Sequence, residues 1–208
     1  MDDVGDIFDL GMAKKRDHKI MITDEAIEKV PLVKYKDIPE EVYPILQDLA
    51  KEVLRVSKEE NDSNEVALTF SLEYLDLIRE GREYFGIALG DDHSVDPRLN
   101  AVAGHLIMAS TGCVVIVLHN HPSLSKFSLD DVQFFLRNET VKMMVVITNL
   151  GAISYLTKSK KYDYGESVKL YNEAVNIHNE GSGLRDYQKA VEWFLSNSYN
   201  AGIIYDDR

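Results

Sequence analysis

The sequence predicts a mixed α/β domain that spans residues 63–160. Short runs rich in β-branched and aromatic residues indicate strands, and they lie at 65–72, 84–89, 114–118 and 142–156, the last being two strands joined by a turn. Apolar residues that recur every three or four positions indicate helices between these strands, at 99–110 and 128–138. The chain has 208 residues, of which 45% are hydrophobic, so it can bury the core of one such domain.

Two different segments precede this domain. Residues 1–38 show no clear periodicity and few apolar positions, so we expect an extended or flexible N-terminal arm. Within residues 39–62, apolar side chains such as Val42, Leu46 and Leu49 recur at helical spacing. This second segment is predicted to be an amphipathic helix that packs on the core.

Residues 161–208 carry two further apolar stripes at helical spacing, separated by Gly181-Ser-Gly183. Two amphipathic helices with a glycine joint predict a helical hairpin. Such a hairpin would pack on the core or on a second copy of the chain, so an oligomer is compatible with the sequence.

Charge and composition exclude several classes of function. There are 35 acidic against 23 basic residues, a net charge of −12, and this balance argues against direct binding of nucleic acid. Neither a membrane-spanning apolar run nor a signal peptide is evident, so we expect a cytoplasmic protein without a membrane partner. The single cysteine, Cys113, stands before an apolar run and is expected to be a small buried hydrophobe.

The candidate site begins where the apolar run 114–118 ends in His119-Asn120-His121-Pro122. Residues two apart on an extended strand point to the same face, so both imidazoles can bind one metal ion. A helix then opens at Ser128, and Asp131 can turn back toward the histidines. Two imidazoles and one carboxylate leave one tetrahedral position free, as expected of a catalytic zinc site. Ser128 with Asp131 is also a capping box, which is the structural alternative for this pair.

These residues resemble a known signature. His119-Asn120-His121-Pro122-Ser123 followed by Ser128-Leu129-Asp130-Asp131 looks like the JAMM (JAB/MPN) metalloprotease motif, and is most similar to its RadC-like bacterial branch. The resemblance implies a cytidine-deaminase-like sandwich with a mixed sheet over residues 63–160. It implies one Zn²⁺ per chain, bound by His119, His121 and Asp131, with the Ser128 hydroxyl stabilising an oxyanion.

The same chemistry requires a carboxylate outside the ligand set to accept a proton from water and pass it to the leaving amine. The family resemblance places this general acid/base at Glu65, at the head of the predicted strand 65–72. Glu73, Glu80 and Glu83 are the alternatives; Glu80 and Glu83 flank Gly81 in a predicted hairpin turn.

The resemblance thus implies a zinc-dependent hydrolase of peptide or isopeptide bonds, acting on a protein or peptide such as a ubiquitin-like or tagged protein. A RadC-like non-hydrolytic accessory or scaffold protein, linked to DNA repair or to a mobile element, is the alternative. A metal-dependent nuclease is a third possibility, although such enzymes favour carboxylate-rich sites. The loop at 90–97 holds His93 among three aspartates, and we interpret it as a turn rather than a second metal site.

Overall fold

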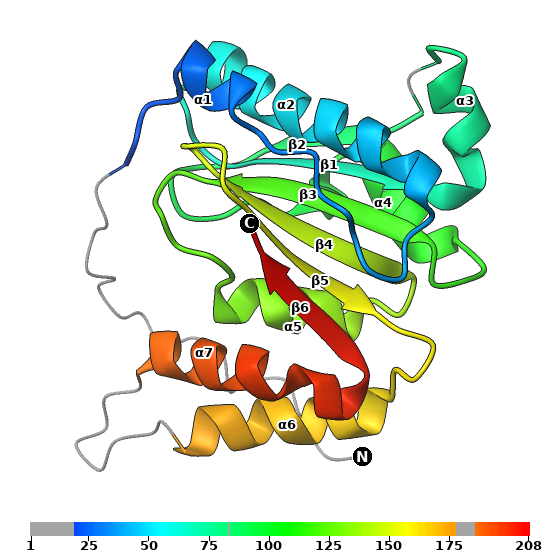
Figure 1. Ribbon diagram of the computed structural model, residues 1–208, viewed down its shortest axis with the longest axis vertical. Coiled ribbons are helices and arrows are strands. Elements are labelled where there is room, and N and C mark those ends of the chain that lie inside the picture. Colours follow the sequence, from blue (N-terminus) through cyan, green and yellow to red (C-terminus); the bar gives the residue numbers. More distant parts are fainter. Residues whose placement is uncertain (1–18, 83, 178–185) are drawn as a thin grey trace.

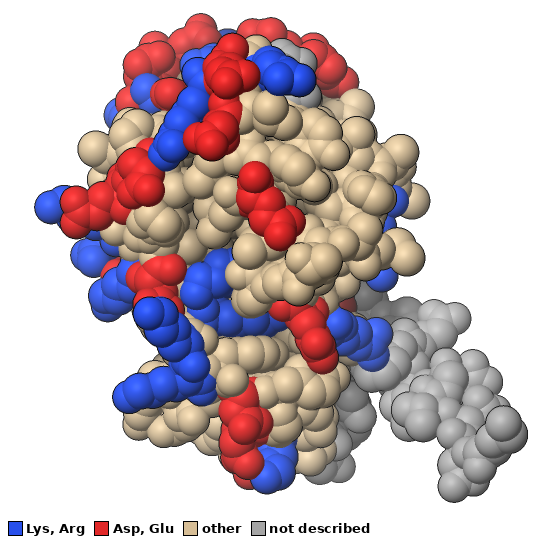
Figure 2. All heavy atoms as spheres, turned by 90° about the vertical axis from the view of Figure 1, so that its right-hand side faces the viewer, with Lys and Arg blue, Asp and Glu red and all other residues tan. Residues whose placement is uncertain are grey.

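The computed structural model describes residues 19–82, 84–177 and 186–208. These residues form a six-stranded sheet of order β2-β1-β3-β4-β5-β6 with helices on both faces (Figure 1). On the face drawn in Figure 2, acidic and basic side chains are interspersed among uncharged ones. The strands are β1 (Val66–Ser71), β2 (Gly86–Leu89), β3 (Val115–His121), β4 (Val141–Thr148), β5 (Ile153–Lys158) and β6 (Ile203–Asp207). Only β3 and β4 pair in parallel, so the sheet is mixed and the predicted α/β class is confirmed.

One face of the sheet is covered by α1 (Asp24–Glu28) and α2 (Tyr43–Glu60), with the short 3-10 helix η1 (Glu40–Val42) before α2. Helix α2 is the predicted amphipathic helix. The segment before it differs from the expected flexible arm, because residues 19–38 contribute Ile22, Ile27, Val30, Val33, Tyr35 and Ile38 to the same core. The rest of the predicted arm, residues 1–18, lies outside the described residues.

The other face is covered by the remaining long helices, which are α4 (Ala101–Ala109), α5 (Leu129–Arg137), α6 (Tyr164–Ile177) and α7 (Tyr187–Asn197). The predicted C-terminal hairpin corresponds to α6 and α7, which contact each other. Its glycine joint lies outside the described residues. The chain then continues through η4 (Ser198–Ala201) into β6, which pairs with β5 and was not predicted.

Two local expectations have different outcomes. Gly81 lies in a turn, with φ +73°, in the connection between the antiparallel strands β1 and β2, as predicted; η2 (Leu72–Tyr74) and a short helix, α3 (Leu75–Arg79), precede this turn, and Glu83 lies outside the described residues. Cys113 is exposed rather than buried, because β3 begins two residues after it. Among the described helices, none has both the length and the apolar character needed to cross a membrane.

The alternation of side chains along β3 decides which of them face helices α4 and α5. Val115 and Val117 belong to the core on that side, whereas Ile116 and Leu118 belong to the core under α2. Since successive side chains alternate, His119 and His121 follow Val117 onto the α4–α5 face. Helix α4 with η3 (Pro97–Leu99) contacts β1 and β2, and α5 contacts β4. The end of β3 therefore lies between these two groups of helices.

Candidate metal centre

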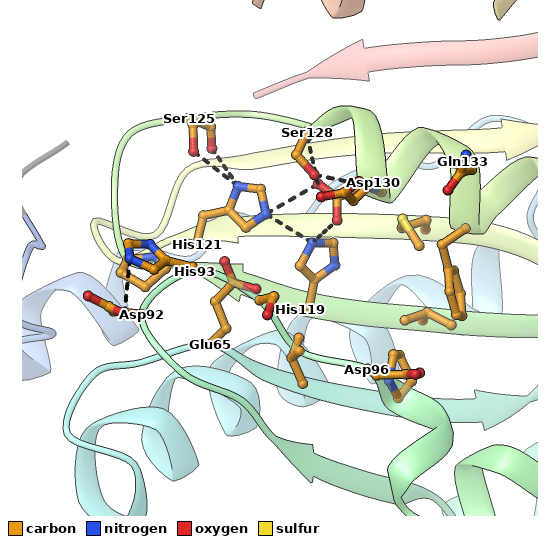
Figure 3. A pocket seen from close by; sticks show the side chains of 18 of the residues that line it. Glu65, Asp92, His93, Asp96, His119, His121, Ser125, Ser128, Asp130 and Gln133 are labelled. Atoms are coloured by element: carbon orange, nitrogen blue, oxygen red, sulfur yellow. Dashed lines mark hydrogen bonds and ion pairs between the residues drawn. The ribbon is translucent and has the colours of Figure 1, made fainter. Parts of the chain in front are cut away.

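The two histidines are the last odd-numbered residues of β3, and both are buried, with 3% and 5% of their surface exposed. The apolar run 114–118 was expected to carry both histidines at the C-terminal end of its strand, and β3 does extend through His121, which pairs with Thr148 of β4. Their Nε2 atoms are 3.1 Å apart. The predicted placement of both imidazoles on one face is what the structure shows (Figure 3).

Asp131 reaches the same point from the first turn of α5. Its Oδ1 lies 3.1 Å from His119 Nε2, and its Oδ2 lies 3.4 Å from His121 Nε2. Ser128 caps the helix: its hydroxyl accepts a hydrogen bond from the Asp131 amide, and its backbone N–H donates to Asp131 Oδ2 over 2.6 Å. The capping box and the cluster with the histidines are thus the same structure, and the cap is what aims the carboxylate.

The geometry of these donor atoms fits a zinc ion. Zn–N bonds of about 2.05 Å at a tetrahedral angle place two ligand nitrogens about 3.3 Å apart, close to the observed 3.1 Å. One ligand atom from each of His119, His121 and Asp131 can be chosen so that all three lie within 4.8 Å of one another. His121 Nδ1 lies 3.1 Å from the Ser125 carbonyl oxygen, a contact in which Nδ1 donates and Nε2 keeps its lone pair for a metal.

Electrostatics make this point favourable for positive charge. Burial alone would lower the pKa of His121, but its hydrogen bond to Asp131 and the charges of Asp131 and Glu65 outweigh burial and raise the pKa to about 9. Burial would raise the pKa of Asp131, yet the charges and hydrogen bonds of His119 and His121 hold it well below its usual range. Two carboxylates thus stabilise a cation here, whether it is a proton or a metal ion.

Glu65 is the candidate that the fold brings to the cluster. It is buried, immediately precedes β1, and lines the same cavity as His119 and His121. Ala67 pairs with His119, so Glu65, two residues earlier, faces the same side of the sheet. Figure 3 shows its side chain directed toward the two imidazoles.

The two other candidates in the described residues, Glu73 and Glu80, lie elsewhere. Glu73 is exposed at the opposite end of β1 and lines a separate cavity, and Glu80 is exposed after α3. The loop at 90–97 forms a turn in which the Asp91 carboxylate accepts hydrogen bonds from the His93 and Ser94 amides. In the described part of the chain, His119, His121 and Asp131 form the only group with the spacing of metal ligands.

Sequence reasoning missed the role of Asn120, which lies between the histidines but faces the opposite side of the sheet. Its side chain is fully buried; Oδ1 accepts from Val66 N–H over 2.7 Å, and Nδ2 donates to Asn149 Oδ1 over 2.8 Å. Nδ2 also lies 3.1 Å from both Ser57 Oγ and the Asn64 carbonyl oxygen. Asn120 therefore ties the end of β3 to α2, to the turn after β4 and to the residue that follows Glu65. The sequence signal for this role was a polar residue in a strand whose side chains are buried on both faces of the sheet.

The cluster lies within a cavity of about 730 Å³. Its rim includes Asp92 and His93, whose side chains are half exposed and 3.4 Å apart. In Figure 3 these two residues lie on the His121 side of the cluster, while Gln133 and Asp96 lie beyond His119. Because the cavity extends to both sides of the cluster, it can hold a chain that passes across it.

Comparisons with known proteins identify no relative of this chain. No family model, no curated protein and no solved structure matches it. Function is therefore inferred from the motif and from the geometry of the site.

Proposed function

We propose that the chain is a zinc-dependent hydrolase of peptide or isopeptide bonds, of the JAMM (JAB/MPN) type and similar to its RadC-like branch. The observation that supports this most is the convergence of His119, His121, Asp131 and Glu65 at one buried point of a cavity. Two imidazoles with one carboxylate suit Zn²⁺ better than a hard cation such as Mg²⁺. The mixed sheet with helices on both faces is compatible with the cytidine-deaminase-like sandwich of that family.

The bound zinc ion would act as a Lewis acid toward the substrate carbonyl and lower the pKa of water. The protein side chains then have separate tasks. Glu65 takes the proton of the attacking water and delivers it to the leaving amine, for which its burial beside the histidines is suited. His119, His121 and Asp131 would hold the ion, with the cap at Ser128 aiming Asp131 at the two imidazoles. The Ser125 carbonyl accepts from His121 Nδ1 and so keeps Nε2 of that ring turned toward the metal position.

The Ser128 hydroxyl has two competing partners, the Asp131 carboxylate and the oxyanion of the reacting substrate. Its hydroxyl donates a hydrogen bond to Asp131 Oδ2 over 2.7 Å. Stabilising an oxyanion requires that this hydroxyl turn toward the substrate, while the backbone N–H of Ser128 keeps Asp131 in place. We propose that the hydroxyl makes this change when substrate is bound.

A protein or peptide substrate is supported by the cavity, whose lining residues lie on both sides of the cluster. The proposal includes ubiquitin-like or tagged proteins, whose attachment bond is an amide of the same kind. The test is hydrolysis of mixed peptides and of isopeptide-linked conjugates by the zinc-loaded full chain, followed by mass spectrometry. Glu65→Gln is expected to lower kcat by about 10²- to 10⁴-fold while zinc content is retained.

Glu73→Gln is the matched control, because Glu73 is exposed in η2, beyond the far end of β1 from Glu65. It is expected to leave hydrolysis unchanged. If Glu65→Gln is as active as the unchanged chain, the assignment of Glu65 is wrong. If the zinc-loaded chain hydrolyses no amide substrate, the hydrolase proposal fails and the accessory or scaffold alternative is favoured.

A further inference from the structure

The floor of the cavity becomes apolar at the residue of β3 that precedes His119 on the same face. The preceding residue on the same face is Val117, and the parallel register pairs it with Met144 of β4. Both side chains line the cavity, although only 1% and 2% of their surfaces are exposed. On this side the floor is therefore apolar.

The walls of this part come from two elements. Phe134 of α5 and Pro97 of η3 line the cavity, and so does Val95 of the loop before η3. The guanidinium of Arg98, also from η3, lies 5.8 Å from the centre of the Phe134 ring, so the two walls meet at this point. The Arg98 charge is matched by Asp96, with two nitrogen–oxygen distances of 2.9 Å. Arg98 and Asp96 therefore line this part of the cavity as a matched ion pair.

The opposite half of the cavity is polar. Ser123, Ser125, Asp92 and His93 line it on the His121 side of the cluster, and Figure 3 shows Ser125, Asp92 and His93 on that side, whereas Asp96 and Gln133 lie beyond His119. An extended chain lying across the cluster consequently meets the apolar floor on the His119 side only, beside the polar residues Asp96, Arg98 and Gln133 that also line that half.

We propose that Val117, Met144, Phe134, Pro97 and Val95, here called the apolar pocket, bind one apolar side chain of the substrate next to the bond that is cut. This inference rests on the proposed hydrolase function and defines its substrate class as peptides with a residue such as leucine, methionine or phenylalanine at that position. A charged side chain is disfavoured, because none of the five residues can pair with it, the neighbouring Arg98 and Asp96 already pair with each other, and its burial would be costly. A glycine would leave the pocket unfilled.

The first test compares kcat/KM of the zinc-loaded full chain on peptides that differ only at this position. Each methylene bound in an apolar pocket changes kcat/KM by about 10- to 200-fold, so leucine is expected to exceed glycine by at least about tenfold. Val117→Phe should reverse this preference by filling the pocket. If Val117→Phe does not fold, Phe134→Ala takes its place. This change, at a half-buried position, should shift the preference toward larger side chains. Met108→Ala, at an 82% exposed site on α4, is the control and should change nothing.

A second test does not depend on zinc or on turnover. With ¹³C-methyl methionine, the Met144 methyl resonance, assigned through Met144→Leu, is followed during addition of N-acetyl-leucine amide or N-acetyl-glycine amide. The leucine compound is expected to shift it saturably and the glycine compound to leave it unchanged, with the effect reduced in Phe134→Ala. Equal response to both compounds would overturn the apolar pocket. Selective binding without any amide hydrolysis would instead retain the pocket and refute the proposed function.

Discussion

Replacing Asn120 with alanine should destabilise the whole chain, because one buried side chain holds four partners together. Asn120 has no exposed surface, and its loss removes the partners of Val66 N–H and Asn149 Oδ1, which both stay buried. At about 1–3 kcal/mol for each buried polar group left without a partner, two such groups cost about 2–6 kcal/mol. For a chain of this size, each kcal/mol lost lowers Tm by about 2–4 °C. A loss of about 4 kcal/mol at about 3 °C per kcal/mol, the middle of each range, lowers Tm by about 12 °C.

The assay is thermal unfolding followed by circular dichroism and checked by calorimetry. Asn172→Ala is the matched control, since Asn172 is exposed on α6, and alanine there should change stability by less than about 0.7 kcal/mol. Because Asn120 and Asn149 share a hydrogen bond, the double variant should lose less than the sum of the two single changes. A Tm of Asn120→Ala within about 1 °C of the unchanged chain would refute the reasoning.

Three further changes test other parts of the structure. Burial lowers the pKa of Lys158 to about 8, so the unfolded chain binds more protons between about pH 8 and 10.5; stability should rise over that window by up to about 3 kcal/mol. Urea unfolding at several pH values should show this rise in the unchanged chain but not in Lys158→Met; equal slopes would contradict it. Ser128→Ala should lower stability by about 1–2 kcal/mol through loss of the cap yet keep zinc, and a loss of zinc would mean that the hydroxyl is needed to place Asp131. Gly151→Ala should cost more than about 2 kcal/mol, because φ is +87° and a Cβ would lie 2.5 Å from a backbone oxygen; Gly112→Ala, where a Cβ meets only ordinary contacts, is the control, and similar melting temperatures would refute the strain.

The centre of the fold could be predicted because its signals are local. A β-branched run that ends in His119 and His121 indicates both the strand and the shared face of the imidazoles, and the cap at Ser128 indicates the start of α5. Pro122 indicates the end of the strand directly after His121, although the polar residues before it do not continue the apolar pattern. In the structure these residues are nevertheless buried, since their partners are other polar groups rather than apolar side chains.

Elements that depend on distant partners could not be predicted in the same way. Strand β6 is short, ends in two aspartates and lies at the edge of the sheet, so its only strong determinant is pairing with β5. Residues 19–38 are mostly irregular, and their apolar side chains show no helical or strand period although they fill the core under α2. The Asn120 network joins residues up to 63 positions away, and no local pattern reports such contacts.

Metal analysis of the purified full chain by plasma mass spectrometry tests the metal centre most directly. We expect about one zinc ion per chain, lost in His121→Ala and Asp131→Ala. Asp130→Ala is the control, because Asp130 is exposed beside Asp131, and it should retain the metal. Zinc absent from the unchanged chain even after incubation with the ion, or bound equally by all variants, would contradict the site. His119, His121 and Asp131 would then be only a strand end packed against a capped helix.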